Sequence, residues 1–254
     1  MVTGEAEELL GLIDSSERIV ALTGAGISTA SGIPDFRSPG GIWEKEDPME
    51  VATLSVFRRD PERFWRFYRT RLDLADSYRP NAGHLFLAHL GELGKLGAVV
   101  TQNIDGLHQA AGVEEVLVHE VHGSVRELVC LGCGERFLRA RLEDLTVEGL
   151  PRCVCGEILK PGVVLFEEML PAETVDASLT AIGECDLLLV IGSSMVVYPV
   201  AGFPAERSPG ARLAIINDEE TSWGPEADVW LSGDIAGQCS ALSDSLGFGR
   251  PERT

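Results

Sequence analysis

The fold is decided by the stretch Ile19-Val-Ala-Leu-Thr-Gly-Ala-Gly-Ile-Ser-Thr-Ala-Ser-Gly-Ile-Pro-Asp-Phe-Arg37. It opens with a short, β-branched apolar run, Ile19 to Leu22, which predicts a buried strand. Gly24 and Gly26 follow at once, so backbone N–H groups can approach a phosphate closely where a helix begins. Thr29 stands in place of the third glycine of the dinucleotide-binding fingerprint. An ordinary tight strand-to-helix turn therefore explains these glycines equally well.

The end of the same stretch favours nucleotide binding over a plain turn. Pro34 would break a helix, so we expect a loop here. Within this loop, Asp35, Phe36 and Arg37 place a carboxylate, an aromatic ring and a guanidinium side by side. The ring is suited to cover a nucleotide, and the guanidinium to bind phosphate or ribose.

Outward from this stretch, five more apolar runs complete a predicted sheet. They are short, continuous and separated by helical patterns, which is typical of an α/β fold with a Rossmann-like parallel sheet buried on both faces. We expect strands at 19–22, 98–101, 116–121, 185–191, 213–216 and 229–231, and helices at 4–13, 61–74 and 81–96. Each strand ends in small polar residues or amides, and ligands bind at the carboxyl ends of such strands.

The charge and the apolar pattern exclude some classes of protein. A net charge of -19 argues against a stand-alone nucleic-acid binder and favours basic partners. Lys45, Lys95 and Lys160 are the only three lysines. This suits a halophilic source, although a GC-rich genome would also replace lysine by arginine. No apolar run predicts a membrane span and the acidic N-terminus lacks a signal peptide's basic region, so we expect a cytoplasmic protein.

Four cysteines have the spacing of metal ligands. Cys130 and Cys133 form one close pair, Cys153 and Cys155 form another, and the pairs are about twenty residues apart. Two disulfides or four buried thiols are the alternatives, but a cytosolic chain rarely keeps disulfides. We predict one structural Zn2+ with four thiolate ligands, which leaves no open position for chemistry.

Polar clusters after two other strands point to a ligand pocket. Gln102, Asn103 and Asp105 follow the strand at 98–101, and a helix N-cap alone would need fewer such side chains. His119 and His122 close the strand at 116–121, where a histidine is a good general base near neutral pH. Position alone leaves the choice between the two histidines open.

Taken together, these motifs resemble those of the sirtuins, a family of NAD-dependent protein deacylases. The resemblance covers nearly the whole chain and rests on Gly24 to Arg37, Thr101 to His108, Glu120 to Ser124, the four cysteines, Lys160 to Pro171, Gly192 to Met195, and Ile216 with Asn217. It implies an NAD-dependent protein lysine deacylase acting on acyl-lysine proteins. In such enzymes the acyl oxygen attacks the nicotinamide ribose as nicotinamide leaves. A histidine then deprotonates a ribose hydroxyl, and the acyl group ends on ADP-ribose.

The resemblance also assigns residues to roles. His122, not His119, stands in the family's Leu-His-Gly position and would be the general base. A substrate peptide would add as a strand along Val163, Val164 and Phe166. The implied NAD contacts are Ala25, Gly26, Thr29, Asp35, Phe36, Arg37, Gln102, Asn103, Ile104, Asp105, His122, Gly192, Ser193, Ser194, Asn217 and Ile235.

The domain organisation implied is a single catalytic domain with two parts. The Rossmann-like part would comprise about 1–38, 82–124 and 163–254, and a small module about 39–81 and 125–162, with a zinc ribbon in 125–162. A monomer is favoured. The sequence departs from the family at Glu167, where Phe-Glu-Glu replaces the usual Phe-Gly-Glu, and this bears on substrate preference.

Acyl preference and reaction type have alternatives. Tyr68 and Arg71 lie three residues apart on the predicted helix at 61–74, and a Tyr-x-x-Arg holds the acyl carboxylate in sirtuins that remove succinyl or malonyl groups. Those members usually carry Ala where Thr29 stands and Thr where Asp35 stands, and a solvated arginine-rich surface also explains Arg71. Protein ADP-ribosyl transfer in the same pocket is one alternative function. A non-catalytic NAD-sensing zinc-ribbon adaptor is another.

Overall fold

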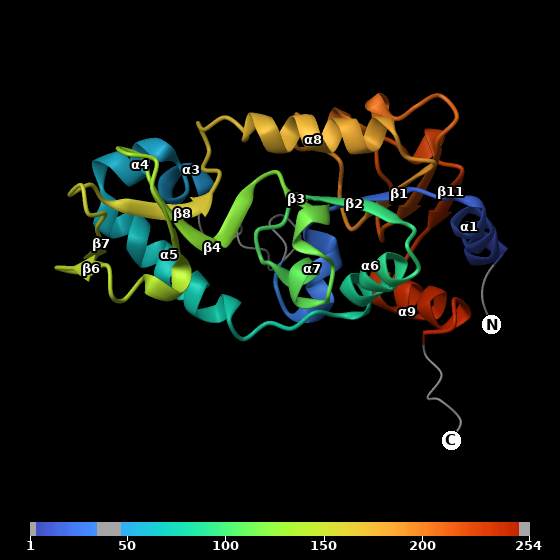
Figure 1. Ribbon diagram of the computed structural model, residues 1–254, viewed down its shortest axis with the longest axis horizontal. Helices are drawn as coiled ribbons and strands as arrows, with labels where there is room; N and C mark the ends of the chain where they lie inside the picture. The colour runs from blue at the N-terminus through green and yellow to red at the C-terminus, as the bar shows by residue number, and fades with distance from the viewer. Residues whose placement is uncertain (1–3, 35–46, 249–254) are drawn as a thin grey trace, which may run out of the picture.

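The computed structural model describes residues 4–34 and 47–248, and its centre is a six-stranded parallel sheet (Figure 1). The strand order is β11-β10-β9-β1-β2-β3. The strands are β1 (Ile19–Thr23), β2 (Leu96–Thr101), β3 (Val118–Glu120), β9 (Leu187–Ile191), β10 (Arg212–Ile216) and β11 (Val229–Leu231). From β1 the chain winds to one side through β2 and β3, and later to the other side through β9. The β1/β9 boundary is therefore the switch point at which α/β sheets bind ligands.

Helices cover both faces of this sheet. Residues of α1, α6 and α9 pack on one face, and residues of α8 and the 3-10 helix η4 on the other (Figure 1). Leu187 and Leu189 of β9 contact the first layer, whereas Leu188 and Val190 contact the second. Both faces are thus buried, which explains the uninterrupted apolar runs. The bounds are α1 Gly4–Ser15, α6 Ala82–Glu92, α9 Ile235–Ser245, α8 Ala172–Gly183 and η4 Val200–Glu206.

A separate apolar core joins two segments that are far apart in sequence. It combines buried residues between Val51 and Leu72 with others between Val125 and Leu165. Trp65 lies in it, 1% exposed, and its indole N–H donates to the Leu159 carbonyl at 2.9 Å. The elements here are α3 (Pro48–Val51), α4 (Leu54–Arg59), α5 (Pro61–Ala75), β4 (Gly123–Cys130), β5 (Arg136–Leu138), β6 (Thr146–Val147), β7 (Leu150–Pro151) and β8 (Leu159–Val163).

Short elements connect these layers. They are η1 (Ala25–Ser31), α7 (Leu107–Ala110), η2 (Glu115–Leu117), η3 (Arg139–Arg141) and η5 (Gly224–Glu226). No helix in the ranges 4–34 and 47–248 is both long and apolar enough to cross a bilayer.

The predicted α/β class with a parallel sheet is confirmed, and several boundaries are corrected. The helix expected over 81–96 ends at Glu92, because Gly94 has a φ of 71° and Leu96 already opens β2. The strand expected at 116–121 is limited to Val118–Glu120, since the residues before it form a 3-10 turn. The strand expected from residue 185 begins at Leu187. Apolar sequence patterns locate the centres of strands more accurately than their first and last residues.

Candidate active site

Two glycine turns meet at the switch point between β1 and β9. The Gly26 N–H donates to the Gly192 carbonyl at 2.8 Å, and a Cβ on either Gly24 or Gly26 would lie 2.8 Å from that same oxygen. Only residues without a side chain allow two backbones to approach this closely. Gly24 and Gly26 therefore have a packing role here, beside the phosphate approach that the sequence predicts.

A cavity of about 340 Å³ opens beside these turns, at the carboxyl ends of β1, β10 and β11. Three predicted cofactor residues, Gly26, Thr29 and Ile235, line it together. Sequence reasoning did not assign the other lining residues to the site: Ile27, Ala30, Asp218, Gly233, Asp234 and Ala236. Asp218 lies two residues beyond the end of β10 and Asp234 three residues beyond the end of β11. That position is the signal by which they could have been found.

The remaining predicted contacts of this region flank the cavity. Asn217 directly follows β10 and is 8% exposed, and its carbonyl accepts the indole N–H of Trp230 at 3.1 Å. Ser193 is buried and accepts a hydrogen bond from the Gln102 amide at 2.8 Å, which ties the end of β9 to the end of β2. Ser194 is exposed, and Ala25 is the half-buried first residue of η1.

A buried polar network links η1 to the segment after β2. The Asn103 amide donates to the Gly24 carbonyl and to the Ser28 hydroxyl, both at 3.1 Å. Ser28 in turn donates to the Asp105 carboxylate at 2.7 Å. His84, fully buried, lies 3.3 Å from the Ser28 hydroxyl through Nε2. The structure thus brings predicted Asn103 and Asp105 together with Ser28 and His84, to which the sequence assigned no role.

His122 is held in one tautomer by the backbone. Its Nδ1 lies 2.9 Å from the Gln102 carbonyl oxygen, which can only accept, so Nδ1 carries the proton and Nε2 has the free lone pair. Burial lowers the pKa of His122, and the hydrogen bond to the carbonyl partly opposes this. The ring is therefore neutral near pH 7 and is ready to accept a proton at Nε2.

The other histidines have different surroundings. His119 faces α8, where its Nδ1 lies 3.4 Å from the Ser178 hydroxyl, and burial lowers its pKa. His108 is buried and contacts the Thr23 hydroxyl at 3.0 Å, as a structural residue would. His89 stacks on Phe248 at the surface of α6, with ring centroids 4.2 Å apart. Among the five histidines, only His122 combines a fixed tautomer with a position at the β2 end.

The predicted peptide-binding edge follows β8. The Val164 N–H donates to the His122 carbonyl at 2.8 Å, so this edge and the histidine are in direct backbone contact. Val163 pairs with Gly123 of β4, and Phe166 forms a parallel bridge with Thr53. Glu167, where the resemblance leads us to expect glycine, has a φ of 74°, a left-handed conformation that glycine adopts without strain.

Tyr68 and Arg71 both lie on α5, and their immediate surroundings differ. Tyr68 is 8% exposed and stacks on Phe64 with centroids 4.5 Å apart. Burial raises its pKa, so the hydroxyl stays protonated at any physiological pH. Arg71 lies over the Phe67 ring at 3.4 Å and donates to the Phe67 carbonyl at 3.0 Å. The aromatic stripe of α5 faces the core, so this helix is not wholly solvated.

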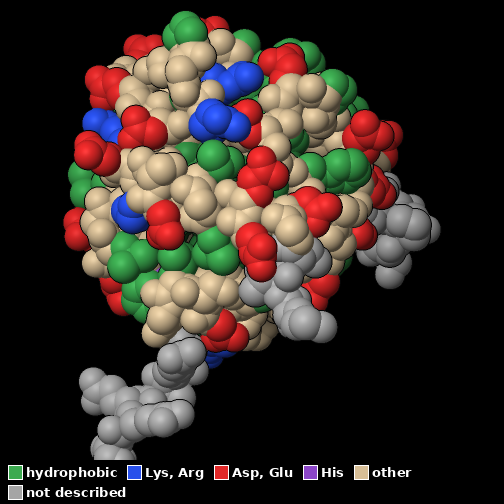
Figure 2. Space-filling model, turned by 90° about the vertical axis from the view of Figure 1, so that its right-hand side faces the viewer, with side chains coloured by type: hydrophobic (Ala, Val, Ile, Leu, Met, Phe, Trp, Pro, Cys, Tyr) green, Lys and Arg blue, Asp and Glu red, His purple; other side chains and the backbone are tan. Residues whose placement is uncertain are grey.

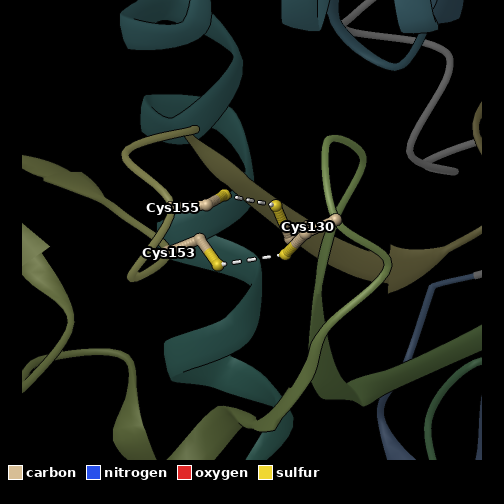
Figure 3. A group of neighbouring side chains, drawn as sticks. Cys130, Cys153 and Cys155 are labelled. Carbon is tan, nitrogen blue, oxygen red and sulfur yellow. Dashed lines mark hydrogen bonds between the residues drawn. The ribbon is translucent and has the colours of Figure 1, made fainter.

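The four predicted metal ligands come together in space. The Cys130 and Cys155 sulfurs are 3.5 Å apart, the Cys133 and Cys153 sulfurs 3.6 Å, and all four lie within 4.8 Å of one another. Figure 3 shows the Cys155 side chain directed at that of Cys130, with Cys153 beside Cys155 on the facing turn. A disulfide would require about 2.05 Å, so these pairs are not disulfides.

These distances fit a zinc ion. A tetrahedron with Zn–S bonds of about 2.3 Å has sulfur separations of about 3.8 Å, close to those observed. One Zn2+ with four thiolates would have no open coordination position. Cys130 ends β4 and Cys133 lies in the turn after it, whereas Cys153 and Cys155 lie between β7 and β8. The cluster is therefore suited to hold the two segments together.

Three predicted cofactor residues, Asp35, Phe36 and Arg37, lie outside the described residues. Ile104 is described: it is half-buried, its side chain packs against the second apolar core, and its carbonyl accepts from the Val125 N–H at 3.1 Å. It thus contacts both the strand-end cluster and the second core.

Comparison with known proteins gives this site a context. The Sir2 family model matches residues 24–199. An NAD-dependent protein deacetylase of Sulfolobus acidocaldarius is 44% identical over 230 residues, covering 89% of this chain and 88% of that one. An NAD-dependent protein deacylase 2 of Pyrobaculum aerophilum is 44% identical over 224 residues, covering 87% of this chain and 88% of that one.

Solved structures agree over almost the whole length. A Sir2 complex with a p53 peptide and NAD+ is 34% identical with a TM-score of 0.85, and covers 96% of this chain and 99% of its own. A structure of a Sir2 enzyme that is 39% identical has a TM-score of 0.85 and covers 97% of this chain and 99% of its own. The fold, the turn sequences at the strand ends and the cysteine cluster all lie in the matched region, and the chain belongs to the Sir2 family.

Proposed function

We propose that this chain removes acyl groups from protein lysine side chains with NAD as co-substrate, and that His122 is its general base. The observation that carries this assignment is the hydrogen bond from His122 Nδ1 to the Gln102 carbonyl, which leaves Nε2 free at the end of β2. The relatives named deacetylase or deacylase support the reaction class. As a member of this family, the chain is an NAD-dependent protein lysine deacylase.

The residues around His122 are suited to bind and orient the reacting groups. NAD supplies a ribose carbon that the acyl oxygen can attack and a ribose that accepts the acyl group. Gln102 and Ser193 are already hydrogen-bonded to each other, and Asn103 and Asp105 are fixed through Ser28. Polar side chains that are held before the ligand arrives lose less entropy on binding. His122 then accepts the proton of a ribose hydroxyl at Nε2.

The charge of the chain supports basic substrates. A net charge of -19 attracts lysine- and arginine-rich segments over long range, and the rate of encounter would fall as salt screens this attraction. We therefore propose that acyl-lysines within basic sequences are preferred over those within acidic ones.

The decisive experiment measures nicotinamide release with and without an acetyl-lysine peptide. Release should depend on the peptide, and acyl-ADP-ribose should form in equal amount. His122→Ala should lose at least about 100-fold in kcat while NAD still binds, because general-base catalysis contributes about that much. His119→Ala, whose ring faces α8, is the matched control and should retain activity. Equal losses in the two variants would reject His122 as the base, and peptide-independent nicotinamide release would reject deacylation.

A second proposal concerns acidic acyl groups. Tyr68 and Arg71 are close enough that the Arg71 charge opposes the rise in the Tyr68 pKa, and Glu168 beside the predicted peptide edge acts on the same hydroxyl. A protonated phenol and a guanidinium near that edge are suited to bind a succinyl carboxylate. Arg71→Met should then abolish succinyl-lysine turnover and spare acetyl-lysine turnover. Arg66→Met, an exposed arginine of the same helix, is the control. Equal effects of Arg71→Met on both peptides would contradict this proposal.

A further inference from the structure

Glu167 holds a backbone conformation that glutamate rarely adopts. Its φ is 74°, and only two other non-glycine residues of the described ranges, Glu148 and Met195, have a positive φ. A side chain at such a position persists when surrounding contacts hold it in place. The position follows Phe166, at the end of the predicted peptide-binding edge, so contacts made by Glu167 bear on that edge.

The contacts of Glu167 are with the first turn of α4. Its carboxylate accepts the Ser55 backbone N–H at 2.9 Å through one oxygen and the Ser55 hydroxyl at 3.0 Å through the other. The first N–H groups of a helix have no partner within the helix, and a carboxylate there is also favoured by the helix dipole. Thr53 provides a second cap, because its hydroxyl accepts from the Val56 N–H at 3.1 Å. Glu167 and Thr53 thus share the capping of α4.

The backbone beside Glu167 is fastened to the same place. The Phe166 N–H donates to the Ala52 carbonyl, and the Phe166 carbonyl accepts from the Leu54 N–H, both at 3.1 Å. These two hydrogen bonds continue a strand-like pairing into the turn before α4. The two side-chain bonds of Glu167 lie directly after this pairing and close its end.

The next carboxylate secures the other side of the turn. The Glu168 carboxylate accepts the Leu165 N–H at 2.8 Å and forms an ion pair of 3.0 Å with Lys160 of β8. The side chains of Glu168 and Lys160 are both largely buried. Two consecutive glutamates therefore reach two different elements: Glu168 reaches β8 and Glu167 reaches α4. The turn between Leu165 and Glu168 is held from both directions.

We propose that Glu167 is a positioning residue for the acyl-peptide substrate: its bonds to Ser55 fasten Val164–Phe166 to α4 before the peptide binds. This rests on the proposed function, in which the peptide adds as a strand along this edge. An edge that is already extended binds a strand without the entropic cost of ordering it. Loss of the Glu167–Ser55 bonds therefore weakens peptide binding and leaves the chemical step intact.

The test compares four variants of the full chain. Glu167→Gln keeps the strained backbone and the side-chain size but removes the charge, Ser55→Ala removes the hydroxyl, and the double variant completes a cycle. Glu173→Gln removes another exposed acidic charge, from the first turn of α8, and is the matched control. The measurements are KM for an acetyl-lysine peptide, kcat, and the hydrogen exchange rates of the Phe166 and Leu54 amides without ligand.

We expect Glu167→Gln and Ser55→Ala each to raise the peptide KM by about threefold to tenfold with kcat within about twofold, as loss of one intramolecular hydrogen bond would. Both amides should exchange faster, and the double variant should be no worse than the more affected single one. The proposal would be overturned if Glu167→Gln and Ser55→Ala had the KM and exchange rates of the wild type. It would also be overturned if Glu173→Gln raised the peptide KM by the same factor. The exchange rates need no turnover, so they test the fastening even if deacylation is not observed.

Discussion

The Ser28 hydroxyl donates a hydrogen bond of 2.7 Å to the Asp105 carboxylate, joining the helix after β1 to the segment after β2 across 77 residues of sequence. The donor and the acceptor can also be assigned in the hydrogen bonds that lead from Asn81 through His84 to Ser28. The Asn81 N–H donates to His84 Nδ1 at 3.3 Å, so His84 Nε2 carries the proton and points at the Ser28 oxygen. Each group in this chain therefore donates to the next, toward Asp105.

From this chain we predict that Ser28→Ala lowers kcat/KM for NAD by about tenfold to a hundredfold, because Asp105 loses a charge-assisted hydrogen bond in a buried site. Ser31→Ala is the matched control: it removes a hydroxyl from the same 3-10 helix that accepts from Asn81 and does not contact Asp105. Steady-state kinetics at saturating peptide would measure both. Equal kinetics in Ser28→Ala and wild type would show that Asp105 is fixed by other contacts.

Removal of zinc should unfold the small module and leave the chemistry of His122 only indirectly affected. Cys153→Ser should reduce the zinc content from one ion per chain to near zero and lower the Tm by about 10 °C or more, since the metal contributes folding free energy. Cys185→Ala, a buried cysteine of the α8 layer, should keep its zinc. Elemental analysis and calorimetry measure these outcomes, and Cys153→Ser with full zinc and an unchanged Tm would reject the site.

Stability should fall as the pH drops through the range of the buried histidines. Burial lowers the pKa of His84 to about 4 and that of His108 to about 3, whereas both titrate near 6.5 when unfolded. The unfolded state therefore binds more protons between pH 6.5 and 4, so the free energy of unfolding decreases as pH falls across that window. Urea titrations at pH 7.5, 6 and 5 should show the loss.

His108→Gln isolates one part of this effect. The glutamine amide can still reach Thr23 but does not titrate. The free energy of unfolding should therefore decrease by about 1 to 2 kcal/mol less between pH 6.5 and 5 in the variant than in the wild type. His89→Gln, for a partly exposed ring, serves as the comparison. A His108→Gln curve parallel to that of the wild type would mean that His108 takes up its proton equally in both states.

The cavity should discriminate NAD from NADP by charge. Asp218 and Asp234 line it, its described lining residues include no lysine or arginine, and the Asp234 carboxylate already accepts the Ala236 N–H at the start of α9. An additional phosphate on the ribose would meet two carboxylates in place of a cation. The Kd measured by calorimetry should be at least about tenfold higher for NADP than for NAD, and Asp218→Asn should reduce this ratio of dissociation constants. An unchanged ratio in the variant would exclude Asp218 as a determinant.

Molar potassium chloride should raise the Tm if the acidic surface is halophilic. Figure 2 shows many acidic side chains and few basic ones on one face, and the chain carries a net charge of -19. Salt would screen the repulsion among these carboxylates. Melting curves at increasing potassium chloride concentration measure the effect, and a Tm that falls steadily with salt would contradict the idea.

The sequence predicted what depends on local pattern and missed what depends on distant contacts. The strand cores and the cysteine cluster follow from apolar runs and ligand spacing, which are visible in a single chain. The role of His84 cannot be read from the sequence, because a histidine in a helical pattern gives no sign that the Ser28 hydroxyl lies 3.3 Å away. The same is true of Glu167, whose partner Ser55 is 112 residues distant. The sequence shows that Glu167 stands where the family usually has glycine, and only the fold shows that the added side chain bonds to Ser55.

The position of β1 in the sheet has a consequence for biosynthesis. β1 pairs with β2 on one side, but its other neighbour, β9, begins only at Leu187. While the ribosome is still making the residues between, one edge of a strand that is entirely buried in the folded protein has no partner, and such edges are prone to aggregate. The interval includes the whole zinc-binding segment. A chain released before Ile191 therefore exposes the β1 edge, and nascent chains of that length are where chaperone capture and proteolysis should concentrate.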